Sequence, residues 1–257
     1  MNRINEKTER SRIDSRAYPS WITSTSALSP SYCGADKALS LTGAFSLLVD
    51  AAAVHCERIG TGCADMAAAH RFWLMTRAHI LFRRRPSMME EITVTTWPEA
   101  PRHFLCNRNY TVEGEGGLLL EGHHEWAVLD TDTLQPIRTE GIYPAAFTPL
   151  PRTGPSPFSR LCDTLGEDTL SYTYKVTTSD IDFGKHVNNT RYIRMLTDSF
   201  SVQELSELSV REAEIRYLSS ATEGEVLGIF KERTEDGYRF AIRHEDGKPA
   251  ALAHFVA

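Results

Sequence analysis

Several features that mark large classes of protein are missing from this sequence. No apolar run approaches the ~20 residues of a membrane-spanning helix. Asp and Glu (34) outnumber Lys and Arg (28), and the resulting net charge of −6 argues against a nucleic-acid binder. The five cysteines are odd in number and scattered, without a C-x-x-C pair, so reduced thiols in a cytosol fit better than a disulfide framework or a zinc site. We therefore expect a cytoplasmic protein with no membrane span and no nucleic-acid partner.

Common catalytic and nucleotide-binding motifs are missing as well. The chain contains no G-x-S-x-G, H-E-x-x-H, P-loop or G-x-G-x-x-G. His123 and His124 are neighbours on an expected strand, so their imidazoles point to opposite faces and make a poor metal pair. Cys56 has helical spacing from apolar neighbours, which favours a core position over a nucleophile. The sequence predicts no metal site.

The length and the N-terminal segment limit the number of domains. At 257 residues the chain can bury a core as one large domain or two small ones. The first 20 residues carry charges of both signs without an apolar centre, so they make a poor signal or transit peptide. We expect residues 1–30 to form a flexible tail.

The same order of elements is predicted twice, on either side of a proline-rich stretch. Residues 144–167 hold several prolines with little periodicity, which indicates an extended crossover. Before it we expect a helix over 41–59 and strands over 72–82, 91–97, 103–112 and 118–129. After it we expect a strand over 172–177, a helix starting at Asn188 or Asn189, and strands near 212–218, 225–232, 238–244 and 250–256.

This repeated order predicts an α+β duplication. In each copy an antiparallel sheet can wrap one long helix, and joining the two sheets edge to edge hides two exposed strand edges. The predicted units are residues 31–143 and residues 168–257, with 144–167 as the linker.

The most informative stretch is residues 179–196, which combines titratable groups with a helix start. Asp182 and His186 precede Asn188, a favoured N-cap residue, and the apolar residues that follow have helical spacing. A carboxylate and an imidazole beside free helix N–H groups, which can stabilise an oxyanion, are typical of acyl transfer. An Asx-type turn with a solvent-facing histidine explains the same spacing.

With loop, helix and repeat in place, the chain resembles the acyl-acyl-carrier-protein (acyl-ACP) thioesterases, a double-hotdog family. In the first half the likeness lies in Trp73–Arg77, in the Glu91–Pro98 segment with its Thr-Trp-Pro end, and in Glu125–Asp130. In the second half it lies in Ser179–Asp182 and in His186–Asn189. The resemblance implies a tandem hotdog fold, hydrolysis of the thioester between a fatty acyl chain and the carrier protein's phosphopantetheine arm in fatty acid biosynthesis, and no cofactor.

The family's catalytic residues transfer only in part. The family loop reads Asp-x-Asn-x-His, and Asp182 and His186 match its ends, whereas Gly184 replaces the Asn. The family Glu, three residues after the tyrosine of the following strand, corresponds to Ser220. We expect Asp182 to orient His186 or hold the water, His186 to relay the proton, and N–H groups near Asn188 to serve the oxyanion. Losing one such polar group commonly costs roughly 10²- to 10³-fold in rate.

Substrate contacts are expected from the first unit. Phe45, Leu48 and Trp73 lie where the family's acyl-chain pocket runs, although any core would contain such residues. The densest basic run of this acidic chain is Arg83, Arg84 and Arg85. These arginines are candidates for docking the carrier protein, and the alternative is that they form the solvated end of a strand without a binding role. The sequence also leaves open whether the protein forms a homodimer.

Two other functions stay open beside the hydrolase. A hotdog hydroxyacyl dehydratase also uses a histidine and a carboxylate, although the Asp182–His186 spacing and the Thr-Trp-Pro strand favour the thioesterase. A non-catalytic acyl-binding protein is supported by the substitutions at Gly184 and Ser220.

Overall fold

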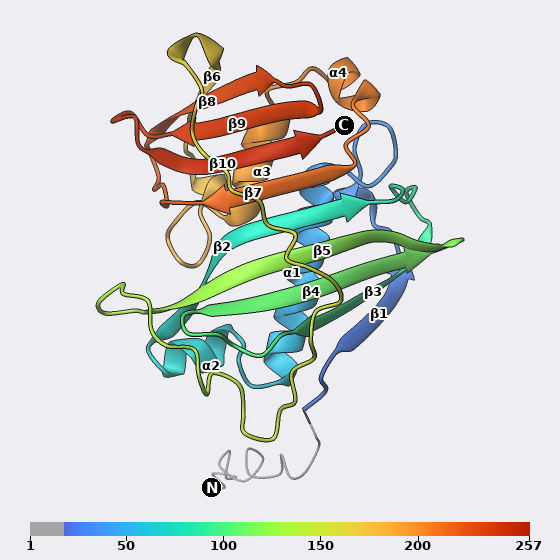
Figure 1. Ribbon diagram of the computed structural model, residues 1–257, viewed down its shortest axis with the longest axis vertical. Helices are drawn as coiled ribbons and strands as arrows, with labels where there is room; N and C mark the ends of the chain where they lie inside the picture. Colours follow the sequence, from blue (N-terminus) through green and yellow to red (C-terminus); the bar gives the residue numbers. More distant parts are fainter. Residues whose placement is uncertain (1–17) are drawn as a thin grey trace, which may run out of the picture.

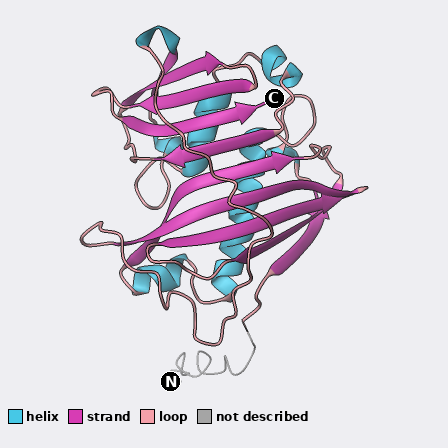
Figure 2. Ribbon diagram, viewed as in Figure 1, coloured by secondary structure: helices cyan, strands magenta, loops and turns pink. Residues whose placement is uncertain are grey.

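The protein is built on a single ten-stranded sheet, with its two main helices on one face and a long crossover on the other (Figures 1 and 2). A computed structural model describes residues 18–257. The strands are β1 (Ile22–Ala27), β2 (Arg71–Phe82), β3 (Glu91–Pro98), β4 (Leu105–Gly114), β5 (Gly117–Asp130), β6 (Leu170–Lys175), β7 (Glu212–Tyr217), β8 (Val226–Arg233), β9 (Gly237–Arg243) and β10 (Pro249–Val256). The helices are α1 (Leu41–Arg58), α2 (Cys63–Ala68), α3 (Asn189–Thr197) and α4 (Val202–Glu207), with 3-10 turns η1 (Pro30–Tyr32), η2 (Glu167–Thr169) and η3 (Thr178–Asp180).

The strand order repeats about the middle of the sheet. From one edge to the other it runs β1-β3-β4-β5-β2-β7-β10-β9-β8-β6, so each half has the same internal order when read inward. The halves join where β2 pairs antiparallel with β7, between Arg77↔Arg216 and Leu81↔Glu212. The predicted fold class, two helix-wrapping antiparallel sheets joined edge to edge, is confirmed.

The expectation of a loose tail through residue 30 was wrong in part. Residues 22–27 form β1, which pairs with β3 and exchanges threonine hydrogen bonds with it, Thr23 with Thr95 (3.0 Å) and Thr25 with Thr93 (2.9 Å). Only Ile22 of this strand is buried, so the sequence lacks the apolar alternation that marks a strand. The open edge of β3 supplies the pairing. Residues 1–17 lie outside the described part of the chain.

Each half wraps its sheet around one helix. Ser40 caps α1, because its hydroxyl accepts from the Gly43 N–H (2.9 Å), and the buried face of α1 carries Ala44, Phe45 and Leu48. α3 buries apolar residues in the same way on the second half of the sheet, and the two helices contact one another. One continuous core therefore runs beneath both halves.

Charged groups cover the seam between the halves on the crossover face. Arg77 of β2 pairs with Glu214 of β7 (2.6 Å), and His79 pairs with Glu212 (2.8 Å). The Glu214 carboxylate also accepts from the backbone N–H and hydroxyl of Ser159 in the crossover. Because Glu214 is almost fully buried, these bonds fix the crossover to the seam.

The shorter helices α2 and α4 were not predicted, because six residues give too little periodicity. Within residues 18–257, no helix combines the length and the apolar character needed to span a membrane. In the same range, no three His, Cys, Asp or Glu side chains are grouped so that they could hold a metal ion.

Candidate functional site

The loop before α3 is a tight turn closed by backbone hydrogen bonds. The Asp182 N–H donates to the His186 carbonyl (3.0 Å), and the Lys185 N–H donates to the Asp182 carbonyl (3.0 Å). Lys185 has φ of 62°, the left-handed conformation that the turn requires. The Asp182 carboxylate accepts from the Gly184 N–H (2.8 Å), which makes the Asx turn that the sequence left open. Asp182 and His186 are both partly exposed at the two ends of this turn.

The side chains of Asp182 and His186 are brought to one loop but are not hydrogen-bonded to each other. Among the described residues, the His186 imidazole has no hydrogen-bond partner. Its ring nitrogens are therefore open to a hydrogen bond with substrate or water, while one oxygen of Asp182, Oδ1, is engaged in the Asx turn.

Asn188 starts α3 as predicted. Its side-chain oxygen accepts from the Thr190 N–H (2.9 Å) and hydroxyl (2.7 Å), and its own N–H donates to the Asp180 carbonyl (2.8 Å). The Asn188 N–H is thus already paired, so any helix N–H offered to an oxyanion has to come from the residues after it. The buried Asp180 accepts from Tyr174 and Thr177 and anchors the loop from below.

The buried Tyr192 and the partly buried Tyr217 tie this loop to the segment after β7. The Tyr192 hydroxyl accepts from the Ala221 N–H (3.0 Å), and the Tyr217 hydroxyl donates to the Asn189 carbonyl (3.1 Å). The Val187 N–H donates in turn to the Ala221 carbonyl (2.9 Å). Burial, together with the negative charges of Glu225 and Asp182, raises the pKa of Tyr192 to about 12. Residues 182–188 and 219–225 therefore form one site.

The two substituted positions are both exposed in this site. Gly184 does not have a positive φ, and a Cβ there would lie 3.0 Å from Asp182 Oδ1. Ser220 follows Ser219 in the loop after β7. Neither side chain carries a carboxylate or an amide.

Glu225 and His244 were not among the predicted site residues. Their side chains form a 2.9 Å pair next to Ser219, at one end of the strands, because Glu225 directly precedes β8 and His244 directly follows β9. Sequence spacing gave no signal for this, because strand pairing brings the three residues together.

The predicted acyl-contact residues belong to the core of the first half. Phe45 and Leu48 are buried on α1, beneath β5. Trp73 is partly exposed on β2, where its indole donates to the Thr61 carbonyl (3.0 Å) and packs edge-on against Trp126.

The three predicted docking arginines are each paired with a carboxylate. Arg84 makes a bidentate pair with Glu90 (2.8 and 2.7 Å), and Arg85 pairs with Asp36 (2.7 Å). Arg83 makes only a 3.3 Å contact with Glu121, and its side chain is 58% exposed. Arg83 is therefore the most available of the three.

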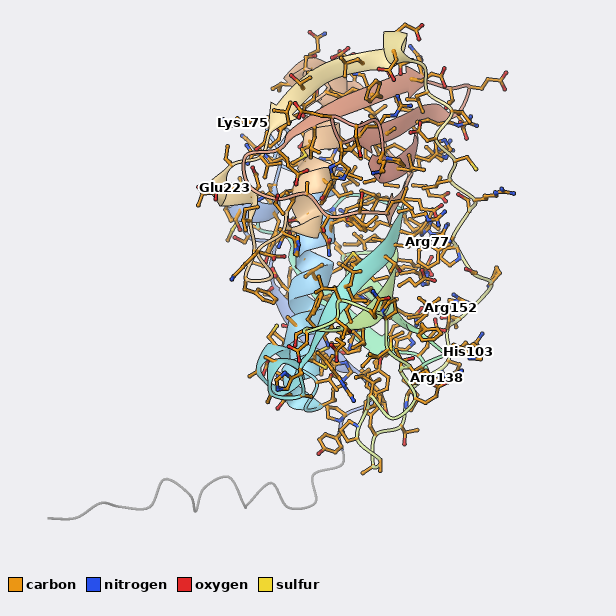
Figure 3. All side chains as sticks on the ribbon, turned by 90° about the vertical axis from the view of Figure 1, so that its left-hand side faces the viewer. Arg77, His103, Arg138, Arg152, Lys175 and Glu223 are labelled. Atoms are coloured by element: carbon orange, nitrogen blue, oxygen red, sulfur yellow. The ribbon has the colours of Figure 1, made fainter. Side chains whose placement is uncertain are left out.

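A hollow of about 650 Å³ lies on the crossover face, where β2 and β7 diverge beyond their pairing. Its lining includes Arg77, Arg160 and Arg216 together with Glu125 and Phe158. Figure 3 shows Arg77 on the crossover face of the sheet and Glu223 on the opposite face. The Glu223 carboxylate accepts from the Thr178 hydroxyl, a few residues before Asp182. The hollow and the loop thus flank the seam from opposite faces.

A sheet that wraps a helix, repeated and fused edge to edge, defines the class of tandem hotdog proteins. Two family models match the chain, the acyl-ACP thioesterase N-terminal domain over residues 27–143 and the acyl-ACP thioesterase C-terminal domain over residues 165–254. The chain therefore belongs to the acyl-ACP thioesterase family.

Individual relatives agree with this assignment at low identity. An acyl-[acyl-carrier-protein] hydrolase (FATB3, chloroplastic) of Cuphea viscosissima is 23% identical over 239 residues, which cover 85% of this chain. A palmitoyl-acyl carrier protein thioesterase (chloroplastic) of Gossypium hirsutum is 25% identical over 201 residues, 71% of this chain. The chain spans 58% and 48% of the lengths of these two relatives. An acyl-ACP thioesterase structure from Bacteroides thetaiotaomicron has the same fold, with a TM-score of 0.82 at 21% identity, covering 92% of this chain and 97% of the other.

Proposed function

We propose that the chain is a fatty acyl-ACP thioesterase, which hydrolyses the acyl thioester to free fatty acid and the carrier's free thiol. Family membership supports the reaction, and the exposed loop that carries Asp182 and His186 before α3 supports its place. The thiolate is a good leaving group, since a thiol has a pKa near 8.5, so the reaction needs little more than a positioned attack on the carbonyl.

In this proposal the two halves divide the work. Residues 168–257 carry the catalytic loop, in which His186 moves the proton and Asp182 positions it. Residues 31–143 take the acyl chain against the α1 face of Phe45 and Leu48 and against Trp73, and residues 144–167 connect the halves. Gly184 and Ser220 replace two family catalytic residues, so we expect slow turnover.

The test is a substrate survey with the purified chain. Thiol release from acyl-ACP and acyl-CoA is measured over a series of chain lengths, and free fatty acids are profiled after expression in a bacterium. Steady release of thiol and fatty acid supports the hydrolase. Tight retention of fatty acid without any thiol release would instead support the acyl-binding alternative, which Gly184 and Ser220 favour. Hydration of a crotonyl thioester would support a dehydratase.

Carrier docking is proposed for the basic run around Arg83. Because Arg84 and Arg85 hold structural ion pairs, replacing them would confuse docking with folding. Arg83→Glu should raise KM for acyl-ACP, spare acyl-CoA and lose its effect at high salt. Arg138→Glu, on an equally exposed side chain, is the matched control. Equal effects of Arg83→Glu on both substrates would end the docking proposal.

We further propose a cytoplasmic location and keep the homodimer as a prediction. All five cysteines are free thiols, which supports a reducing compartment. Fractionation of the source cells checks the first point, and sedimentation analysis checks the second.

A further inference from the structure

A serine, a histidine and a glutamate form an unbroken hydrogen-bonded relay beside the catalytic loop. Ser219 Oγ lies 2.9 Å from His244 Nε2, and His244 Nδ1 lies 2.9 Å from Glu225 Oε2. A histidine whose two nitrogens bridge a hydroxyl and a carboxylate is the arrangement that activates a serine nucleophile. The three residues come from the loop after β7, the end of β9 and the start of β8.

The relay is held rigidly and its hydroxyl is accessible. The other Glu225 oxygen accepts from the Thr222 N–H (2.8 Å) and hydroxyl (2.6 Å), which fixes Oε2 toward the imidazole. Burial opposes ionisation of Glu225, yet the hydrogen bonds from Thr222 and His244 hold its pKa below the usual value, so it stays a carboxylate. Ser219 is exposed, whereas the His244 side chain is only 17% exposed.

The proton arrangement follows from the partners. With Glu225 accepting from Nδ1–H, neutral His244 presents Nε2 as an acceptor, and the Ser219 O–H donates to it. The Pro249 carbonyl lies 3.0 Å from the same hydroxyl and is the competing acceptor. The single hydroxyl proton can be donated to only one of these two acceptors at a time, and the imidazole is the base of the two.

The relay belongs to the same site as Asp182 and His186. Ser219 is followed by Ser220, the position at which the family carboxylate is missing, and then by Ala221, which is hydrogen-bonded to Tyr192 and Val187. The same loop also offers a backbone N–H donor for an oxyanion. Among the described residues the Ser220 N–H has no hydrogen-bond partner, while the N–H groups of Leu218 and Ser219 both donate to the Ala250 carbonyl. The N–H after the nucleophile is the donor that serine hydrolases use.

We propose that Ser219 is the nucleophile of thioester hydrolysis, with His244 as its base and Glu225 as the positioning residue. This rests on the proposed thioesterase function. Ser219 Oγ bonds to the thioester carbonyl carbon while its proton passes to His244 Nε2. The C–S bond then breaks, the thiolate takes that proton, and an acyl ester remains on Ser219. Water attacks this ester, gives a proton to His244, and releases the fatty acid as Ser219 Oγ regains the proton. In this mechanism His244 carries the proton transfer that the proposed function assigned to His186.

The experiment uses the full chain and two readouts. A fluorophosphonate probe is followed by peptide mapping, and rapidly quenched reactions with acyl-ACP are analysed by intact mass for an added acyl group. We expect both labels on Ser219. Ser219→Ala and His244→Gln should each lower thioester turnover by roughly 10²-fold or more, with the melting temperature unchanged. His254→Gln is the matched control, because His254 also pairs with a carboxylate, Asp236 (3.3 Å), but contacts no serine.

Glu225 needs a readout that a structural role would not move. Glu225→Gln should slow labelling of Ser219, Glu225→Asp should recover part of it, and Glu225→Gln should add no further loss to His244→Gln. If Glu225→Gln and His244→Gln instead slow the labelling of Ser219 independently of each other, Glu225 has only a structural role, and its part in the relay is overturned.

The outcomes separate this proposal from the proposed function. If wild type hydrolyses thioesters and Ser219→Ala retains full activity without any acyl-enzyme, the nucleophile assignment is wrong and the thioesterase stands. If wild type hydrolyses no thioester, the proposed function fails, and the fluorophosphonate probe then tests whether Ser219 is activated. Labelling of Ser219 that is lost in His244→Gln supports an activated serine, and absence of labelling overturns it.

Discussion

Two buried histidines predict that this protein loses stability in mild acid. His55, near the end of α1, and His124, on β5, have no exposed surface. Burial, together with the nearby Arg108 guanidinium, lowers the pKa of His55 to about 4 and that of His124 to about 3. The hydrogen bonds agree, because His55 Nδ1 faces an Arg108 donor (3.0 Å) and must accept, so its other nitrogen donates to the Pro19 carbonyl.

The sign follows from proton binding in the two states. In the unfolded chain a histidine has a pKa of about 6.5, so between pH 6.5 and 4 the unfolded state binds more protons than the folded state. The stabilising effect is complete above pH 6.5 and is lost as the pH falls toward the folded pKa. From pH 7 to pH 5 each histidine should cost ~2 kcal/mol in the free energy of unfolding, or on the order of 4 kcal/mol for the pair.

Urea unfolding at a series of pH values between 7 and 5 measures this loss. His124→Gln should reduce this loss by ~2 kcal/mol, whatever it does to stability at pH 7; the remainder includes His123, whose pKa burial also lowers to about 4. His70→Gln is the control, because the His70 side chain is 72% exposed. A free energy of unfolding that stays level from pH 7 to pH 5 would show that these histidines are not held neutral in the folded state.

Three further predictions concern the site and the seam. Asp182→Asn and His186→Ala should each lower kcat/KM at least ~10²-fold without lowering the melting temperature, because both residues lie on an exposed loop; full activity of His186→Ala would remove the loop from the catalytic centre. Gly184→Asn combined with Ser220→Glu should raise kcat with little change in stability, because Gly184 has no positive φ and only the Asp182 carboxylate has to shift. An unchanged kcat in a folded variant would show that Gly184 and Ser220 do not limit turnover. Glu214→Ala should destabilise by ~3–5 kcal/mol, seen as a melting temperature lower by on the order of 10 °C, because it leaves Arg77, whose side chain is only 20% exposed, without its carboxylate; a loss below about 1 kcal/mol would mean that solvent replaces the pair.

Local patterns were enough to predict most of the elements. The alternation in residues 91–97 and the helical spacing after Asn188 predicted β3 and α3 to within a residue or two, because each element has one face in the core. Where burial does not impose a period, prediction failed. β1 has a single buried residue, and α2 is too short to show a helical face.

The sequence by itself determined the repeated helix-and-strand order, the start of α3 and the residues of the Asp182–His186 loop, because these depend on neighbours along the chain. Only the tertiary structure decided which distant side chains meet. The pairing of β7, β10, β9 and β8 brings Ser219, His244 and Glu225 together at one end of these strands. The same packing pairs Arg84 with Glu90 and Arg85 with Asp36, which leaves less free charge than the basic run suggests. A sequence pattern shows which face of an element is buried, whereas strand register and loop closure decide which polar groups come within hydrogen-bond distance.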